Sequence, residues 1–529
     1  MKFADVLDAT TAGALDAAWL NAQLEPLSEP GRRAYAQFAP LRPGEESRAQ
    51  ERAQCIADLA ARIDAAEVDA MRDALRGMPD PLPAISRAAM GDTLEDANLL
   101  ELLRFLEIAQ RLHAYVPVCE DARGVAQLLE RGRAGKFGFY LSEKFDAGLA
   151  PVRADAQRAQ AEFDSARGRL AQRVSRELGR EEISGGEFIV MRDGLGALPR
   201  GVRVVREAPT YLLCELDLDE PALEALRKRD AAAARVAAAE ESVRARVSQE
   251  IRERSRALDA LVHAVGDFDV QLAQVRFTQQ HACVPAQIVA QPCVRFTNAR
   301  YLPLQYELET QGRRYEPISL ELSDAAVLTG PNMGGKSVAL RTCGFVALLA
   351  AFGIPVPAEN AQCAIFDEIA WLGIGAQESL GGLLSSFARE VVRLNELLAR
   401  PASHALLLVD EFARTTTPHE GKALLVALIR SLRRRGRLAF IATHLAGIAA
   451  DAQARHFAVR GLRDVPKAAP AGDLQAALAS LADSMDYAVV EVGDGGSAQA
   501  DAVALAHLLG LDDDIVAEAA HVLEGEATA

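Results

Sequence analysis

The sequence predicts an α/β fold with a doubly wound, mostly parallel sheet in the C-terminal half, preceded by a mainly α-helical region that contains a small β element. In the C-terminal half, apolar runs of strand length alternate with helical stretches, as in a parallel sheet that helices cover on both faces. The three clearest runs are AAVLT at 325–329, ALLLV at 405–409 and LAFIAT at 438–443. Before about residue 285, apolar residues recur instead at the three- and four-residue spacing of helices.

The helical part divides into two predicted domains. The first, residues 1–150, is rich in Ala, Leu, Arg and Glu, and its clearest amphipathic helix covers 94–112. In the second, residues 151–284, the stretch 187–217 changes to short apolar strands between Asp-Gly and Pro-Arg-Gly turns, which predicts the small β element. This second domain opens at Pro151 with a helix whose large apolar residues share one face: Phe163, Leu170, Val174 and Leu178.

A second helical stripe in this domain runs from Pro221 to about Phe268, with apolar residues on one side and Arg and Glu elsewhere. A single helix of this length would measure on the order of 70 Å, long enough to act as a lever between two ends of a molecule. Two shorter core helices with a break between them are the alternative.

Composition limits the partners and the location. The net charge is −16, whereas proteins whose main task is to bind duplex phosphates usually have a basic surplus. No apolar run approaches the ~18 residues of a membrane span, and the N-terminus lacks a basic segment followed by an apolar one. We therefore expect a cytoplasmic protein with no membrane partner. The seven cysteines form no Cys-x-x-Cys pair and are expected to be reduced.

Residues 325–337, AAVLTGPNMGGKS, place the phosphate-binding pattern Gly-x-x-x-x-Gly-Lys-Ser directly after a strand and before a helix. Glycines let backbone N–H groups close around phosphates, and the helix N-terminus adds a positive dipole. Lys336 is expected to reach the β- and γ-phosphates of a nucleoside triphosphate, and the Ser337 hydroxyl to ligate Mg²⁺. A Gly-rich surface turn is the alternative. The predicted cradle comprises Gly330, Pro331, Asn332, Met333, Gly334, Gly335, Lys336 and Ser337.

Acidic and imidazole side chains follow the next two apolar runs. Asp410 and Glu411 come directly after ALLLV, and His444 follows LAFIAT. Because ligands of parallel α/β sheets bind at the carboxyl ends of the strands, we expect these residues to meet at the phosphate-binding loop. Asp410 would hold the Mg²⁺ hydration shell, Glu411 would act as the general base on the attacking water, and His444 would sense the γ-phosphate.

In their order and spacing, TGPNMGGKS, IGAQESLGGLLSSF, LLLVDEF, TTTPHEG and IATH resemble the ATPase domain of MutS proteins, a branch of the ABC-type P-loop ATPases. The resemblance covers about residues 285–525, since MDYAVVEVGDGGSAQADAVALAHLLGLDDDIVAEAA is similar to the MutS C-terminal tail. Residues 187–268 more weakly resemble the MutS core with its lever helices. The resemblance places the ATPase domain at 285–464 and a linker with a strand and helical tail at 465–529.

The resemblance implies Mg²⁺-dependent hydrolysis of ATP by a homodimer with composite sites. The residues assigned above keep their roles. Ser385 corresponds to the signature-loop residue that completes the neighbouring subunit's site. Tyr315 corresponds to the aromatic residue that stacks on the adenine.

Two departures from the family concern the partner. Neither a unit with the Phe-x-Glu wedge that reads mismatches nor a nuclease-like Smr domain is recognisable in this sequence, so we expect both to be lacking. The resemblance still implies lever movement on DNA, in a mismatch-repair-like or other DNA transaction. The charges of the lever helix lead us to expect that DNA binding is weak and does not select mismatches. Glutamates interleaved with the arginines of 244–256 should offset much of their positive field. Small MutS-like chains also accompany cobalamin-dependent aminomutases as reactivating factors, so an ATP-dependent protein-remodelling factor is the alternative.

Overall fold

The computed structural model describes residues 1–135, 138–179, 183, 186–193, 196–331, 334–373, 386–400, 404–462, 485–492, 503 and 511–528. The chain forms two compact units, one of Met1–Arg76 with Gly266–Ala529 and the other of Gly77–Val265. The first 150 residues, which the sequence analysis groups as one helical domain, are thus divided between the two units. No helix in these described ranges is long and apolar enough to cross a membrane.

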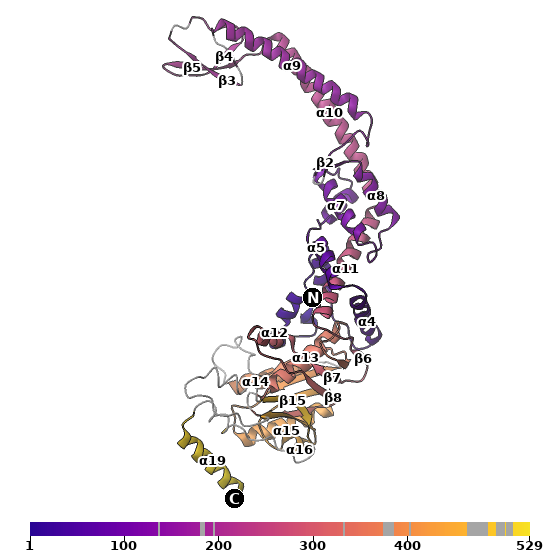
Figure 1. Ribbon diagram of the computed structural model, residues 1–529, viewed down its shortest axis with the longest axis vertical. Coiled ribbons are helices and arrows are strands. Elements are labelled where there is room, and N and C mark those ends of the chain that lie inside the picture. The colour runs from indigo at the N-terminus through magenta and orange to yellow at the C-terminus, as the bar shows by residue number, and fades with distance from the viewer. Residues whose placement is uncertain are drawn as a thin grey trace. The chain divides into compact units, whose positions relative to one another are not determined.

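The first unit is built around a six-stranded sheet (Figure 1). Its strands are β9 (Ala326–Thr329), β11 (Glu368–Leu372), β12 (Ala405–Asp410), β13 (Leu438–Ala442), β14 (Arg455–Leu462) and β15 (Met485–Glu491). They lie in the order β11-β12-β13-β9-β14-β15, and all neighbours are parallel except β15, which pairs antiparallel with β14. The three apolar runs that the sequence predicts as strands are therefore β9, β12 and β13, side by side.

Helices cover both faces of this sheet. α13 (Lys336–Ala351) packs on one face, where Phe345 and Leu408 belong to one buried core. α14 (Ser386–Ala399), α15 (Pro418–Arg434) and α16 (Ile448–Ala452) pack on the other, where Val409 and Leu425 belong to a second core. In Figure 1, α13 lies above the strands and α15 and α16 below them. Because both faces of β12 are buried, its sequence is a continuous apolar run rather than an alternating one.

A second, four-stranded sheet of the same unit has the order β6-β10-β7-β8 and shares the core of α13. Its strands are β6 (Gln287–Val289), β7 (Val294–Ala299), β8 (Ile318–Leu322) and β10 (Asn360–Ala364), with α12 (Leu302–Thr310) between β7 and β8. The helix α19 (Asp513–Thr528) ends the described chain.

The N-terminal residues of this unit form short helices. These are η1 (Phe3–Asp5), α1 (Ala9–Ala14), α2 (Ala17–Gln23), α3 (Glu29–Gln37), α4 (Glu46–Arg62) and α5 (Ala65–Arg76). Side-chain caps explain two of their starts: Asp8 accepts from the backbone N–H of Thr11 at 3.0 Å, and Ser28 from that of Gly31 at 3.0 Å. Leu15 is fully buried in the core that contains α13, so this segment is an integral part of the first unit.

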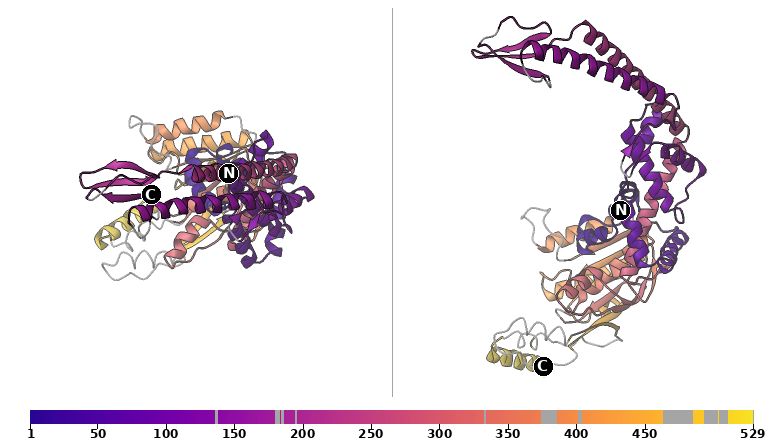
Figure 2. Two further views of the ribbon diagram at one scale, coloured as in Figure 1. Left: turned by 90° about the horizontal axis from the view of Figure 1, so that it is seen from above. Right: turned by 45° about the horizontal axis from the view of Figure 1, so that its top comes forward.

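The second unit contains two long helices, α9 (Leu149–Glu177) and α10 (Glu220–Glu253), which pack along each other (Figure 2). Asp219 caps α10, and Pro221 lies in its first turn. The remaining elements are α6 (Leu82–Met90), α7 (Asp96–Arg111), α8 (Glu120–Glu130), β1 (Arg133–Ala134) and β2 (Gly138–Phe139).

The expectation of one helix from Pro221 to Phe268 is wrong, because the chain has two helices with a break, as in the alternative. α11 (Ser255–Gln280) begins after Arg254, whose φ of −106° and ψ of 9° leave the helical range. The N–H of Arg254 bonds to the carbonyl of Ile251 at 3.1 Å, a three-residue bond that tightens and ends the helix. The apolar stripe continues across the break, so its periodicity did not reveal it.

The small β element is a three-stranded antiparallel sheet of β3 (Glu187–Met191), β4 (Val202–Glu207) and β5 (Tyr211–Leu216), in the order β3-β5-β4. It lies at one end of the α9–α10 pair in both views of Figure 2. One face is buried around Val190 and Cys214. The other face exposes apolar side chains, with Ile189 44%, Met191 57% and Val205 47% exposed.

Candidate active site

The predicted phosphate-binding loop leads from β9 into α13. Gly330 has a φ of 150°, and a Cβ there would lie 3.0 Å from the Cβ of Val459 on β14, so a larger residue would displace that strand. Gly335 precedes α13 with a φ of 87°, in the left-handed region that favours glycine. The loop therefore runs straight into a helix N-terminus, where backbone N–H groups suit an anion. Asn332 and Met333 lie outside the described residues.

Lys336 is held inside this loop and is only 6% exposed. Its Nζ donates to the backbone carbonyls of Gly330 and Pro331, each at 2.9 Å. Burial lowers the pKa of Lys336, and the nearby carboxylates of Glu411 and Asp410 oppose that shift. Phosphate oxygens in the loop would add further negative charge and so favour the protonated amine.

Asp410, the last residue of β12, lies beside the first turn of α13. Burial raises the pKa of its carboxyl group, which accepts a hydrogen bond from Ser337 that acts in the opposite direction. The adjacent hydroxyl and carboxylate oxygens fit Mg²⁺, a hard cation that takes oxygen ligands and usually completes its shell with water and substrate phosphates. The described parts of the chain contain no group of three or more His, Cys, Asp or Glu that could hold a metal ion.

Glu411 starts a strained turn. Its φ is 54° and that of Ala413 is 63°, left-handed conformations that cost non-glycine residues roughly 1–2 kcal/mol each. Two hydrogen bonds from backbone N–H groups hold this turn: the N–H of Glu411 donates to the carbonyl of Ala442 at 3.0 Å, and the N–H of Ala413 donates to the side-chain Oε2 of Glu390 at 2.9 Å. Strain that persists because the surroundings hold it is typical of functional sites.

The Glu411 side chain is 16% exposed, and its Oε2 lies 3.1 Å from a guanidinium nitrogen of Arg414. His444 is exposed and follows Thr443, whose backbone N–H donates to the carbonyl of Leu328 on β9 at 3.0 Å. Since β13 and β9 are parallel neighbours, His444 leaves the sheet at the same edge as the phosphate-binding loop.

Tyr315, the predicted adenine-stacking residue, and Tyr487 lie in different surroundings. Tyr315 is half-buried against the core, and its hydroxyl accepts the backbone N–H of Tyr301 at 3.0 Å. It lines a pocket of about 420 Å³ together with three arginines, Arg300, Arg313 and Arg314. Tyr487 on β15 lies against the loop itself, since a Cβ on Gly335 would be 3.1 Å from its ring. Tyr487 was not predicted as a site residue, although the strand that carries it contributes to the family resemblance.

The predicted signature residue Ser385 lies outside the described residues, which resume with α14 at Ser386. Glu390 of that helix, which holds the Glu411 turn, was missed by sequence reasoning. Its only signal is an acidic residue in an otherwise ordinary amphipathic helix, FAREVVRLNELL.

Comparisons with known proteins point to this same region. The family model for MutS domain V matches residues 326–525. The chain is similar to the endonuclease MutS2 of Gemmatimonas aurantiaca, with 32% identity over 205 residues that make up 38% of this chain and 24% of that protein. It is 42% identical to the Thermus thermophilus endonuclease MutS2 over 129 residues, 24% of this chain and 17% of that protein. The Thermotoga petrophila endonuclease MutS2 is 32% identical over 222 residues, 40% and 28% of the two chains.

The chain thus spans about a quarter of the length of these curated relatives. The matched region begins at Ala326, the first residue of β9, and contains the loop around Lys336 and the acidic pair Asp410 and Glu411. Lys336, Asp410 and Glu411 therefore lie within the part of the chain that carries the similarity, and residues 326–525 are similar to MutS domain V.

Proposed function

We propose that the protein is a Mg²⁺-dependent ATP hydrolase. The observation that carries this proposal is the arrangement around the start of α13, where Lys336, the hydrogen-bonded pair Ser337 and Asp410, and the strained Glu411 turn lie together. Lys336 and the loop N–H groups would bind the β- and γ-phosphates. Ser337 and Asp410 would hold Mg²⁺, which supplies positive charge to the oxygens of the transferred phosphoryl group.

In this proposal Glu411 is the general base. A water oxygen attacks the γ-phosphorus, its proton passes to the Glu411 carboxylate, and the bond from the γ-phosphorus to the bridging oxygen breaks with ADP as leaving group. His444 is proposed to contact the γ-phosphate, and Tyr315 to stack on the adenine.

Two substitutions test the assignment because they separate binding from turnover. Glu411→Gln removes the base but leaves the phosphate cradle, so it should retain ATP and lose turnover by roughly 10²-fold or more. Lys336→Ala should instead weaken ATP binding itself. Hydrolysis by Glu411→Gln at the wild-type rate would show that the base is wrongly assigned.

The family resemblance supports a homodimer with composite sites, in which Ser385 of one subunit completes the site of the other. Mixing Ser385→Ala chains with Lys336→Ala chains would give mixed dimers with one intact and one doubly damaged site. Recovered ATP hydrolysis in the mixture would support shared sites. If mixed dimers verified by mass do not recover ATP hydrolysis, Ser385 does not act on the site of the neighbouring subunit.

We propose DNA as the first candidate for a macromolecular partner, because the similar proteins are named endonucleases. In this proposal ATP hydrolysis drives a movement of the lever helices on the DNA. The arginines of α10 are largely engaged in ion pairs: Arg244 with Asp96 at 2.8 Å and Arg246 with Asp146 at 2.6 Å. Binding should therefore be weak, steeply salt-dependent and indifferent to a mismatch. Equilibrium titrations of duplex, mismatched and branched DNA across a salt series test this.

Remodelling of a protein, such as a cobalamin-dependent aminomutase, is the second candidate. The exposed face of the β3–β5 sheet favours it, because that face is apolar and Arg203 beside it pairs with Glu215. Such a surface suits a protein better than a phosphate backbone. ATP-dependent recovery of an inactivated aminomutase by the wild-type chain, and none by Lys336→Ala, would support this candidate over DNA.

A further inference from the structure

We propose that the N-terminal segment Met1–Leu24 braces the Glu411 turn through α14. In this brace Glu390 is a positioning residue that holds the turn, and Asp8 is the residue that holds α14. The inference rests on the proposed ATP hydrolysis and deepens it, because it assigns part of the control of the general base to Asp8, which lies outside the region that the family model matches.

The segment is fixed to β11, the edge strand of the six-stranded sheet. The backbone N–H of Ile369 donates to the carbonyl of Val6 at 3.0 Å, and the N–H of Trp371 donates to Oγ1 of Thr11 at 2.9 Å. Thr11 is completely buried. The segment thus satisfies backbone donors that the edge strand would otherwise leave unpaired.

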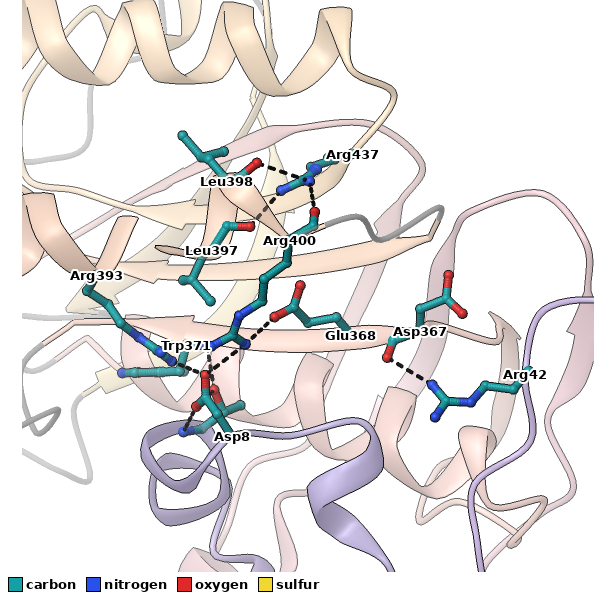
Figure 3. Close-up of polar contacts among 11 residues, drawn as sticks. Asp8, Arg42, Asp367, Glu368, Trp371, Arg393, Leu397, Leu398, Arg400 and Arg437 are labelled. Atoms are coloured by element: carbon teal, nitrogen blue, oxygen red, sulfur yellow. Dashed lines mark hydrogen bonds and ion pairs between the residues drawn. The ribbon is translucent and has the colours of Figure 1, made fainter. Parts of the chain in front are cut away.

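Asp8 links this edge to α14 (Figure 3). Its Oδ1 accepts from the backbone N–H of Thr11 at 3.0 Å and from the Thr11 hydroxyl at 2.9 Å. Its Oδ2 accepts from Arg393 of α14, and a nitrogen of Arg400 lies 3.3 Å away. Both oxygens of the carboxylate are therefore used, one toward the strand and one toward the helix.

The contact between Asp8 and Arg393 is largely shielded from solvent, with the two side chains 21% and 16% exposed. Burial by itself would raise the pKa of Asp8, but the bonds from Thr11 and Arg393 outweigh it and the pKa is lowered. Removal of either side chain leaves the other as a poorly solvated charge. Such a substitution therefore lowers stability more than the loss of an exposed ion pair does.

α14 carries the brace from Arg393 to the active site. Glu390 lies one turn before Arg393, and its Oε2 accepts the buried N–H of Ala413 at 2.9 Å. The ring of Phe387, one turn further, packs against Phe412 with 6.4 Å between centroids. A shift of α14 would move both contacts, and the left-handed conformations at Glu411 and Ala413 depend on such contacts to persist.

The other end of α14 is held independently. Arg437 donates to the carbonyl of Leu397 at 3.0 Å and to that of Arg400 at 2.7 Å, as Figure 3 shows. With its C-terminal end fixed, α14 has its remaining freedom at the end that faces the Glu411 turn. Asp8 restrains the helix at Arg393, which lies between that fixed end and Glu390.

Amide hydrogen exchange of the full chain without nucleotide tests the brace. Asp8→Asn and Arg393→Gln should each raise exchange of the backbone N–H groups in residues 411–416 by about tenfold, as expected for loss of one hydrogen bond that restrains them. The double variant should resemble either single one, because each breaks the same link. Glu390→Ala should give the same local effect, whereas Glu390→Gln, which keeps an acceptor oxygen, should largely restore the wild-type rate.

The matched control is Arg42→Gln. Arg42 is an exposed arginine that follows the segment and reaches the carbonyl of Asp367 at 3.5 Å, but it makes no contact with α14 among the described residues (Figure 3). It should leave exchange at 411–416 unchanged. ATP assays then add a second readout: the brace variants should lower kcat by about tenfold while the Kd for ATP stays within about twofold.

These readouts separate the brace from the proposed function. If the wild-type chain hydrolyses no ATP, the proposed function fails, and the exchange pattern still decides the brace. Unchanged exchange at 411–416 in Asp8→Asn and Glu390→Ala would overturn the brace, as would a uniform rise across the whole chain that Arg42→Gln reproduces.

Discussion

The guanidinium group of Arg414 lies 3.1 Å from the carboxylate of Glu411, so the proposed general base is engaged by a side chain from its own turn. Arg414 is 55% exposed, and ion pairs that reach solvent contribute about 0–1 kcal/mol and are screened by salt. A base that must accept a proton from water has to share or release this partner. The pair therefore imposes a small, salt-dependent cost on turnover.

Arg414→Gln should raise kcat at low salt by up to about fivefold, the factor that corresponds to an exposed ion pair of at most about 1 kcal/mol. The gain should disappear at about 0.5 M salt, where the wild-type pair is already screened. Steady-state ATP hydrolysis at two salt concentrations measures both effects. A tenfold fall in kcat would instead mean that Arg414 stabilises the transition state.

Asp410 should make stability depend on pH. Burial raises its folded-state pKa above the unfolded value of about 3.9, so the native state binds more protons than the unfolded state between the two values. The free energy of unfolding therefore falls as pH rises through this window. Asp410→Asn lacks the titrating carboxyl group. Its free energy of unfolding should therefore rise relative to that of the wild type as pH rises from 4 to 7.

Urea unfolding of both proteins in EDTA, over that pH range, measures the difference directly. The same substitution should weaken Mg²⁺-dependent ATP hydrolysis by at least tenfold, because it removes a proposed metal ligand. A constant difference in stability across the pH range would mean that Asp410 does not titrate with folding.

The sequence predicted the parts of the fold that are local. β9, β12 and β13 follow from apolar runs buried on both faces, and the position of Asp410 at the end of β12 follows from the run that precedes it. The attachment of Asp8 to α14 was not predictable, because it joins residues almost four hundred positions apart through side chains that have no periodic signal. A break was the alternative to one long helix, but its position at Arg254 was not predictable because the apolar stripe continues through it without a Gly or Pro.

The docking of the N-terminal segment onto α13 makes a prediction about packing. A Cβ on Gly344 of α13 would lie 2.6 Å from Leu408 of the sheet and 2.8 Å from Leu15 of the segment. Gly344→Ala should therefore destabilise the first unit by about 1–3 kcal/mol, the range for overpacked cores. Thermal unfolding followed by circular dichroism measures the shift.

Gly168→Ala is the matched control. Gly168 lies within α9, and a new Cβ there would meet nothing within 4 Å apart from the backbone of its own helix turn. The substitution should stabilise that helix by up to about 1 kcal/mol through helix propensity alone. Stabilisation by Gly344→Ala equal to that of the control would show that Leu15 and Leu408 relieve the clash without loss of contact.

The hydroxyl and the ring of Tyr315 have different predicted roles, and two substitutions test them separately. Its hydroxyl accepts the N–H of Tyr301, so Tyr315→Phe should cost about 1 kcal/mol of stability by leaving that N–H unpaired. Phe retains a ring, so ATP affinity should stay within about twofold.

Tyr315→Ala removes the ring as well and should weaken ATP binding by about tenfold, since stacking of a base on an aromatic side chain contributes about 1–3 kcal/mol. Isothermal titration with ATP distinguishes the two variants. Unchanged affinity in Tyr315→Ala would transfer the adenine contact to Tyr487, the aromatic ring that lies against Gly335.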